Sequence, residues 1–344
     1  MRRRATMTDG SHDGRYSRQE RFAPIGFSGQ QRLGQATVVV IGCGALGTAQ
    51  LDQLVRAGVG TLRFIDRDFV DASNLQRQGL YDEADAAACT PKAIAAATRL
   101  ARINRQVRLE PVVAELGPRN VEQLIAGADV VLDGTDNFRT RHLLNEACVR
   151  AGIAWIYGAC VGSYGLSLAI QPGLTPCLAC IQDQLPGPGE TPTCDTSGVI
   201  APIVHLVAAW QVADALRLLT GATPRRRLWT CDLWTDHFQH VDVSTWRDPA
   251  CAVCGPAPTW PRLSERSAPA IVLCGRDTVQ VSCVALDLKA LPTRVGAALI
   301  AANDHLVRWR DGERLITAFR DGRVLVQGVA DGRSARATID RWLG

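Results

Sequence analysis

Glycines, carboxylates and two basic side chains recur after predicted strands in the first half of the sequence. Gly42, Gly44 and Gly47 form a G-x-G-x-x-G run between a β-branched segment and a predicted helix. Glycines at this spacing let the backbone turn tightly and approach phosphates, which the helix N-terminus attracts. Asp66 ends the next predicted strand, about 20 residues on, where a ribose-binding carboxylate belongs. The pattern predicts a nucleotide site, and on its own it suits NAD as well as ATP.

The polar residues that follow Asp66 favour chemistry on a triphosphate over hydride transfer. They are Asp68, the segment Asn74 to Gln78, Lys92 and the segment Asp133 to Asn137. Arg and Lys side chains neutralise charge that builds up on a triphosphate, and a carboxylate can hold Mg²⁺. Lys92 also stands out because this Arg-rich sequence has only one other lysine. For Asp133 we favour a carboxylate that caps a helix over a catalytic one.

The sequence has 12 cysteines, and some of them stand at positions that suggest chemistry. Cys177-x-x-Cys180 and Cys251-x-x-Cys254 have the spacing of zinc-ligand pairs, and four thiolates make a closed tetrahedral site. The two pairs are farther apart than in a zinc ribbon, so four free thiols are the alternative. Cys194 precedes a predicted long helix, whose N-terminus lowers the pKa of a thiol. It is either a reactive thiol or a loop cysteine with no required role.

Strands and helices alternate from Thr37 to Tyr157, which predicts an α/β fold with a mostly parallel, doubly wound, Rossmann-like sheet. Ligands of such sheets bind at the carboxyl ends of the strands, where the polar residues above are placed. The expected strands are residues 37–41, 61–65, 107–113, 129–132 and 153–157, and the expected helices are residues 45–57, 91–103, 121–126 and 139–151.

The pattern changes in the second half of the sequence. We expect a strand at 164–170, a mobile Gly/Pro-rich loop at 186–197, a helix at 199–219 and strands at 228–233 and 237–243. A Pro-rich linker, 255–269, separates an adenylation-type region at 15–254 from a small α+β domain at 270–344. In that domain, Asp-Gly hairpin signals separate strands at 306–310, 314–319 and 324–327, before a helix at 333–343. Residues 1–14 are expected to form a disordered arm.

Composition narrows the choice of partners and location. The net charge of +4 is too small to argue for nucleic acid. The longest apolar stretch, Val199 to Leu219, contains His205, Gln211 and Asp214, which favours a packed helix over a membrane span. The polar N-terminus does not resemble a secretory signal. We therefore expect a cytoplasmic protein without a membrane partner.

Taken together, these stretches resemble the ThiF/MoeB/E1 superfamily, the adenylating enzymes for sulfur-carrier and ubiquitin-like proteins. The resemblance covers Arg15 to Cys254 in the family's order. The matching stretches are Arg15–Gln19, Gly42–Gly47, Asp66–Asp68, Asn74–Gln78, Pro91-Lys92, Asp133–Asn137, Thr193–Val199 and the two cysteine pairs.

The resemblance implies a role for each matching residue. Asp66 would bind the ribose hydroxyls of ATP, and Asp136 would hold Mg²⁺. Arg18 would reach into the neighbouring subunit's site in a homodimer. Asn74, Arg77 and Lys92 would surround the triphosphate. The rest of the implied nucleotide site is Gly42, Gly44, Gly47, Asp68, Gln78 and Asn137, and the implied ligands of a structural Zn²⁺ are Cys177, Cys180, Cys251 and Cys254.

The implied substrate is a ubiquitin-like sulfur-carrier protein that ends in Gly-Gly. Its carboxylate would attack the α-phosphorus of ATP and release pyrophosphate, and Cys194 would bond to the activated carrier or take part in sulfur transfer. Some relatives continue into a rhodanese domain after the second cysteine pair. Residues 270–344 are too short for one and lack its six-residue active loop. We therefore expect a separate sulfur donor and a docking role for this segment.

Three other functions compete with this interpretation. The same fold could activate a different carboxylate or a tRNA base, and the cysteine pairs and Cys194 favour a carrier instead. An inactive partner of a heterodimer would be a binding protein, against which the set of Arg18, Asn74, Arg77, Lys92 and Asp136 argues. An NAD oxidoreductase is the default for the fold alone. The pathway that the carrier serves is left open.

Overall fold

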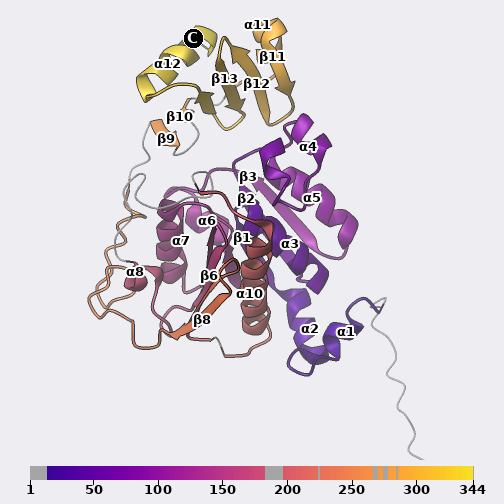
Figure 1. Ribbon diagram of the computed structural model, residues 1–344, viewed down its shortest axis with the longest axis vertical. Helices are drawn as coiled ribbons and strands as arrows, with labels where there is room; N and C mark the ends of the chain where they lie inside the picture. The colour runs from indigo at the N-terminus through magenta and orange to yellow at the C-terminus, as the bar shows by residue number, and fades with distance from the viewer. Residues whose placement is uncertain are drawn as a thin grey trace, which may run out of the picture.

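A mostly parallel sheet forms the centre of the first two thirds of the chain (Figure 1). The computed structural model describes residues 14–182, 197–223, 225–265, 270–273, 278–283 and 286–343. Neighbouring strands follow the order β3-β2-β1-β4-β5-β6-β7-β8. The first five are parallel and the last three are antiparallel. They are β1 (Thr37–Ile41), β2 (Thr61–Asp66), β3 (Arg108–Val113), β4 (Val130–Asp133), β5 (Ala154–Val161), β6 (Tyr164–Ile170), β7 (Arg227–Asp232) and β8 (His237–Asp242).

Helices cover both faces of this sheet, because alternate residues of the central strands face opposite sides. Val38 and Val40 of β1 belong to one core with residues of α3 (Ala45–Ala57), α5 (Lys92–Ile103) and α10 (Ala201–Leu219). Val39 and Ile41 belong to a second core with residues of α6 (Val121–Ile125) and α7 (Phe138–Ala151). The prediction of a doubly wound α/β fold is confirmed.

Helix α10 is long and apolar enough to cross a membrane by length and composition alone. In the fold it packs against α3 and against strands β4, β5 and β6. Gln211 and Asp214 are buried on its packed face, which is the environment of a core helix in a folded domain. His205 is exposed on the same helix, so it makes no contribution to the core.

Two short helices that the sequence pattern did not reveal lie at the amino ends of the strands. They are α1 (Ser17–Glu20) and α2 (Gly26–Gln35). Tyr16 anchors them, since its hydroxyl accepts a hydrogen bond from Asn104 Nδ2 at 2.8 Å. Its ring also fills the space beside Gly58, where any Cβ would lie 2.4 Å from Tyr16 Cζ. This end of the sheet is opposite to the carboxyl ends of β1 and β2 (Figure 1).

A second, antiparallel sheet with the order β11-β12-β13-β14-β10-β9 forms the C-terminal unit, residues 270–343 as far as they are described. The expected hairpins are present, with positive φ at Gly312 and Gly322. A core around Trp309 and Ile316 lies under the closing helix. The elements are β9 (Ala270–Leu273), β10 (Thr278–Ser282), α11 (Leu291–Val295), η2 (Gly296–Ala298), β11 (Leu299–Ala302), β12 (Leu306–Asp311), β13 (Arg314–Phe319), β14 (Arg323–Gln327) and α12 (Gly332–Leu343).

Most predicted elements agree with the structure to within a few residues, and the exceptions have local causes. Pro91 precedes α5 as its N-cap instead of opening the helix. Helix α10 begins at Ala201 because Val199 pairs with Gly162 in an isolated bridge. The predicted mobile loop at 186–197 falls almost wholly outside the described residues, and the predicted arm at 1–14 does so too except for Gly14.

Candidate active site

The glycine loop between β1 and α3 touches the loop that follows β4. Gly42 has a φ of +93°, and a Cβ there would lie 2.5 Å from the carbonyl oxygen of Gly134. A Cβ on Gly47 would lie 1.8 Å from the carbonyl oxygen of Gly42. Neither position has room for a side chain, because backbone atoms cannot move away as a flexible side chain could. The loop is therefore built by close contact between main chains, and it leads directly into the N-terminus of α3.

Asp66, at the carboxyl end of β2, ties that strand to the glycine loop. Its Oδ2 accepts a hydrogen bond from the backbone N–H of Cys43 at 2.7 Å, and its Oδ1 accepts one from Asp68 N at 2.7 Å. Burial raises the pKa of the Asp66 carboxyl, and the positive charge of Lys92 opposes this shift. The predicted ribose carboxylate thus lies directly beside the predicted phosphate loop.

Lys92 begins α5 and faces the same group of residues. Its Nζ lies 3.6 Å from Asp68 Oδ2, and its side chain is 8% exposed. Tyr81 holds this arrangement together, because its hydroxyl donates to the carbonyl of Cys43 at 2.7 Å and lies 3.2 Å from the carbonyl of Lys92. Sequence reasoning missed Tyr81, since no motif marks a tyrosine that bridges two segments through its hydroxyl.

The segment from Asp71 to Gln78 forms a tight turn around η1 (Ala72–Asn74). Asp71 and Asn74 cap it reciprocally, side chain to backbone, and Asn74 is buried. Arg77 bonds back onto this turn through Nη1 and the carbonyl of Ser73 at 2.9 Å. Gln78 is buried, and its Oε1 has no hydrogen-bond partner among the described residues. A buried amide oxygen without a partner is costly, so it marks a place where a ligand or water belongs.

Asp133 ends β4, and its role differs from the predicted helix cap. Its Oδ1 accepts from Thr135 N at 2.9 Å and its Oδ2 from Arg141 Nε at 3.2 Å, with the carboxylate fully buried. The cap of α7 is instead Asn137, whose Oδ1 accepts from Thr140 N at 2.8 Å. Asp133 is therefore half of a buried ion pair that shapes the loop between β4 and α7.

The same loop carries Asp136, which is exposed to solvent at the carboxyl edge of the sheet. Burial lowers the pKa of the Arg67 guanidinium, but the nearby charges of Asp68, Glu115 and Asp136 outweigh it and raise that pKa. Arg67 thus connects the acidic residues after β2 with Asp136 after β4. It stands between Asp66 and Asp68 in sequence, and nothing in its spacing suggested this electrostatic role.

Two predicted site residues do not join this cluster. Arg18 is exposed on α1, at the amino end of the sheet, whereas the glycine loop is at the carboxyl end. Within one chain it is therefore remote from the nucleotide site, and its predicted role in a neighbouring subunit stays a prediction. Cys194 lies outside the described residues.

The two cysteine pairs converge into one cluster. The four sulfur atoms lie within 4.8 Å of one another, and three pairs are separated by 3.9, 3.6 and 3.3 Å. A tetrahedral zinc with Zn–S bonds of about 2.3 Å needs sulfur atoms about 3.8 Å apart. Asn145 of α7 fixes the first pair, because its Oδ1 accepts from Leu178 N at 2.9 Å. The members are Cys177, Cys180, Cys251 and Cys254; α8 (Leu178–Ile181) follows Cys177 and contains Cys180.

Comparison with known proteins gives matches over most or all of the chain. The ThiF family model matches residues 16–253. The chain is 46% identical over 337 residues to the sulfur carrier protein ThiS adenylyltransferase of Bacillus subtilis, covering 96% of this chain and 99% of that protein. It is 39% identical over 243 residues to the SAMP-activating enzyme E1 of Haloferax volcanii, covering 70% and 88%.

Further relatives fit the same picture. The molybdopterin-synthase adenylyltransferase of Salmonella typhimurium is 37% identical over 245 residues, covering 70% of this chain and 96% of that one. Among solved structures, E. coli MccB with ATP superimposes with a TM-score of 0.60 at 23% identity, covering 70% of this chain and 74% of that chain. At that identity the likeness supports the fold.

Proposed function

This chain belongs to the ThiF family, and from that premise we propose that it uses ATP to adenylate the C-terminal carboxylate of a ubiquitin-like sulfur-carrier protein. The observation that carries the proposal is that Asp66 bonds directly to the glycine loop and that Tyr81 links Lys92 to the same loop. A buried lysine at the phosphate end of the site suits displacement at a triphosphate, and hydride transfer does not need one. The activity is that of an adenylyltransferase.

The reaction is an in-line displacement at the α-phosphorus of ATP. A carboxylate oxygen of the carrier forms the new P–O bond, the bond to the bridging oxygen breaks, and pyrophosphate leaves with its electron pair. Lys92 and Arg77 would neutralise charge on the triphosphate, and Asn74 would offer it a hydrogen-bond donor. Lys92 is held in place by Asp68 and by the Tyr81 bridge, so little reorganisation is needed when the nucleotide binds.

The magnesium ion that accompanies ATP fits best beside Asp136. This carboxylate is exposed at the carboxyl edge of the sheet, with Asn137 Nδ2 3.2 Å from its Oδ1. Oxygen ligands of this kind suit Mg²⁺, which keeps several waters and binds substrate phosphates. When bound, the ion would neutralise charge on the leaving pyrophosphate, and Asn137 would keep the carboxylate oriented.

The cysteine cluster fits a structural zinc ion. Its donors are four thiols at tetrahedral spacing, and the pairs come from segments 74 residues apart, from Cys177 to Cys251. A zinc ion there would clip the end of the adenylation region back onto its middle, and with four sulfur ligands it would have no open position for catalysis. The adenylation region is then residues 15–254 and the linker is residues 255–269.

The carrier is of the ThiS type, because the match to the Bacillus subtilis protein extends over its whole length. Its Gly-Gly end would reach the α-phosphate without clashes of side chains. Cys194, at the start of the segment that leads into α10, would bond covalently to the activated carrier or take part in sulfur transfer. The sulfur would come from a separate donor protein.

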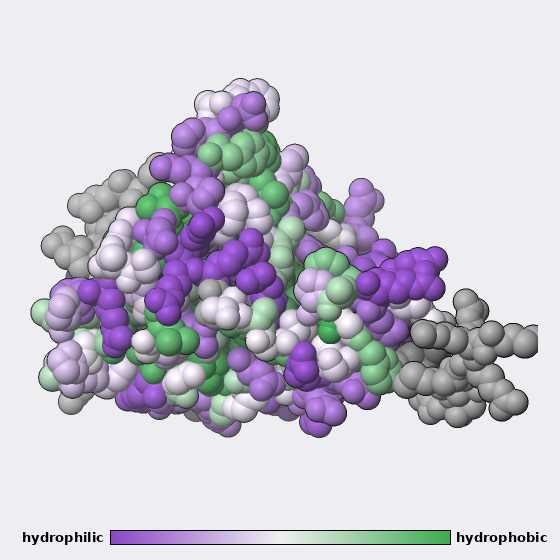
Figure 2. All heavy atoms as spheres, turned by 90° about the horizontal axis from the view of Figure 1, so that it is seen from below, coloured by the Kyte–Doolittle hydropathy of each residue, from purple (hydrophilic) through white to green (hydrophobic). Residues whose placement is uncertain are grey.

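A homodimer would place Arg18 of one subunit in the site of the other. Large apolar side chains that could form such an interface are exposed around α2 and on the β7–β8 hairpin, among them Phe22, Phe27, Trp234 and Phe238. Figure 2 shows that hydrophilic and hydrophobic residues are mixed over the face seen from below. We place the enzyme in the cytoplasm, where its relatives' carriers would be met.

Carrier-dependent exchange of labelled pyrophosphate into ATP tests this proposal. We expect exchange with a ThiS-type carrier and none when the carrier lacks its terminal glycine, because the attacking carboxylate is then out of reach. Exchange with neither the ThiS type nor other Gly-Gly carriers would contradict the function, and exchange without any carrier would point to a different carboxylate substrate.

A further inference from the structure

The C-terminal unit is in contact with the segment that follows Asp66, the predicted ribose carboxylate. Arg323 Nη2 of β14 donates to the carbonyl of Arg67 at 3.0 Å. The guanidinium of Arg308 on β12 lies 4.8 Å from the centre of the Phe69 ring, and the rings of Phe69 and Phe319 are 6.3 Å apart. Arg67 and Phe69, which follow Asp66 and Asp68 in the sequence, are therefore both in contact with the second sheet.

The unit also reaches the end of β3. Gln280 Nε2 on β10 lies 2.5 Å from Glu115 Oε2, and Arg67 Nη1 donates to Glu115 Oε1 at 2.8 Å. Glu115 thus accepts one bond from the loop after β2 and one from β10 of the C-terminal unit. Together with the contact to Arg67, this places the C-terminal unit across the carboxyl ends of β2 and β3 (Figure 1).

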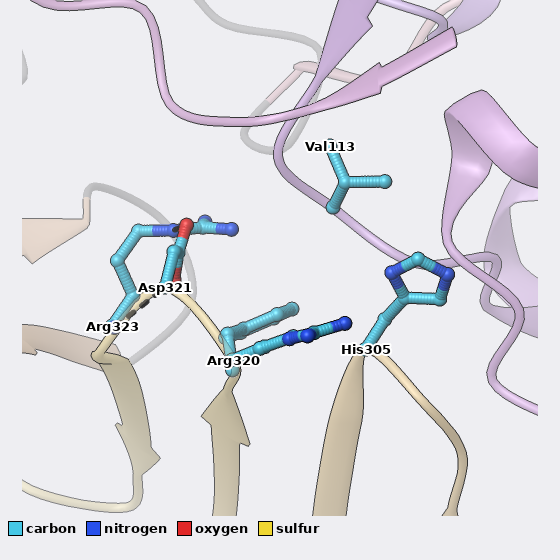
Figure 3. A pocket seen from close by; sticks show the side chains of 6 residues that line it. Val113, His305, Arg320, Asp321 and Arg323 are labelled. Carbon is cyan, nitrogen blue, oxygen red and sulfur yellow. Dashed lines mark hydrogen bonds and ion pairs between the residues drawn. The ribbon is translucent and has the colours of Figure 1, made fainter. Parts of the chain in front are cut away.

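A cavity of about 180 Å³ lies between the two sheets at this point. Figure 3 shows Arg320 extending toward His305 beneath Val113, with Arg323 and Asp321 on the other side. Pockets that hold whole drug-sized ligands measure roughly 300–1,000 Å³, so this one has the size for a single ring system. The buried ring of Phe319 completes the lining.

The cavity is next to the place where a ribose would sit. Val113 is the direct neighbour of Asp66 across β2 and β3, and paired strands lie about 4.8 Å apart. The base of a nucleotide is attached to its ribose, so it must lie within a few atoms of the ribose carboxylate. The cavity is the space that the structure offers on that side.

The polar groups of the cavity suit the edge of a purine. Arg323 is 5% exposed, and its Nη1 is buried without a hydrogen-bond partner among the described residues. Its other nitrogens bond to Asp321 at 2.7 Å and to the Arg67 carbonyl. A buried N–H donor without a partner costs free energy, so it marks the position of a missing acceptor. Asp321 offers an acceptor for an amino group, and Arg320 and His305 offer flat surfaces for stacking.

We propose that the C-terminal unit completes the base end of the ATP site, with the adenine ring in the cavity lined by Val113, His305, Phe319, Arg320, Asp321 and Arg323. The proposal rests on the proposed function, because it takes Asp66 as the ribose ligand. It gives residues 270–343 a direct part in nucleotide selection, whereas the sequence suggested only a docking role.

Titration calorimetry on the full chain without carrier tests this assignment. We expect Arg320→Ala and His305→Ala each to weaken ATP binding about three- to tenfold, as loss of one stacking or hydrogen-bonding partner does. Both substitutions should also lower the ratio of the affinity for ATP to the affinity for GTP. Arg310→Ala is the matched control, an exposed arginine of the same sheet outside the cavity lining, and it should leave ATP binding unchanged.

Competition with inorganic tripolyphosphate separates a base site from an anion site. Its affinity depends on the glycine loop and Lys92, so it should not change in Arg320→Ala or His305→Ala. Equal loss of ATP and tripolyphosphate affinity would show an anion site and overturn the proposal. So would unchanged ATP binding in both variants while the unaltered chain adenylates its carrier. If the unaltered chain binds no ATP, the proposed function itself fails.

Discussion

The glycine loop and the C-terminal unit contribute to the same edge of the first sheet by different physical means. At the loop, main-chain atoms of Gly42, Gly47 and Gly134 are in contact, and no side chain fits between them. The C-terminal unit instead reaches the edge with long side chains, Arg308 and Arg323, stacked on aromatic rings. Contacts between main chains allow little change, whereas contacts through side chains can be trimmed one at a time. A single substitution at the glycine loop should therefore have a large effect, whereas single substitutions in the C-terminal unit should each have a small one.

Loss of the cysteine cluster should have the largest effect, and it should be confined to the first region. Cys251→Ser removes one ligand of the proposed zinc ion, and we expect zinc content to fall from one per chain to none, with a loss of about 4 kcal/mol in the free energy of unfolding. Metal analysis and chemical denaturation measure the two quantities. The half-buried Cys283 belongs to the C-terminal unit, so Cys283→Ser should retain zinc. A metal-free parent protein of full stability would contradict the zinc assignment.

Substitution of Lys92 should abolish most of the activity without unfolding the protein. We expect Lys92→Ala to slow carrier-dependent pyrophosphate exchange about 100- to 1,000-fold, as removal of one electrostatic stabiliser of a transition state does. Lys289 is exposed in the C-terminal unit, so Lys289→Ala is the matched control and should keep the parent rate. Comparable exchange rates for Lys92→Ala and Lys289→Ala would show that Lys92 has no catalytic role.

Much of the first region could be predicted from sequence, and so could β12, β13, β14 and α12 of the C-terminal unit, but not the other elements of that unit. Strand β1 and helix α3 were placed correctly because a β-branched run, a glycine turn and an apolar helical period follow one another locally. Strands β9 and β10 were not, because they are defined by pairing with each other and with β14, nearly fifty residues away from β10. Arg67, Tyr81 and Arg323 were missed for the same reason, since only the folded chain brings their partners near.

An added methyl group at the glycine loop distinguishes the two kinds of contact further. Gly47→Ala would place a Cβ 1.8 Å from the Gly42 carbonyl oxygen, and we expect a loss of about 3 kcal/mol in the free energy of unfolding. Gly44→Ala is the matched variant, because its Cβ meets nothing closer than 3.9 Å and its φ is negative. Chemical denaturation should leave Gly44→Ala within about 0.5 kcal/mol of the parent. Equal stability of the two alanine variants would mean that the loop is not tightly packed.

Acid should also act on the first region before the second. His142 on α7 is buried, and its Nε2 has no hydrogen-bond partner in the part of the chain that the structure describes. Burial, followed by the charges of Arg262 and Arg141, lowers its pKa from 6.5 to about 4. The folded state therefore binds fewer protons than the unfolded chain between these values. The contribution of neutral His142 to the free energy of unfolding is fully present above about pH 6.5 and is lost as the pH falls toward 4.

We expect the free energy of unfolding to fall by about 2 kcal/mol between pH 7 and pH 5 because of His142, as measured by chemical denaturation. The His142→Gln variant should not show this fall. A C-terminal reporter such as the environment of Trp309, buried in the second core, should respond less to this change in pH. An equal loss in the His142→Gln variant would assign the acid sensitivity to other groups.

In the proposed reaction one carboxylate, at the Gly-Gly end of a ThiS-type carrier, becomes adenylated in this site. Intact mass spectrometry of the carrier after incubation with ATP, Mg²⁺ and the enzyme tests it most directly. We expect a carrier–AMP adduct that forms about 100- to 1,000-fold more slowly with Lys92→Ala and does not form with a carrier that lacks its terminal glycine. An unmodified carrier under conditions where the enzyme binds ATP, or an adduct that forms at the parent rate with Lys92→Ala, would contradict this assignment.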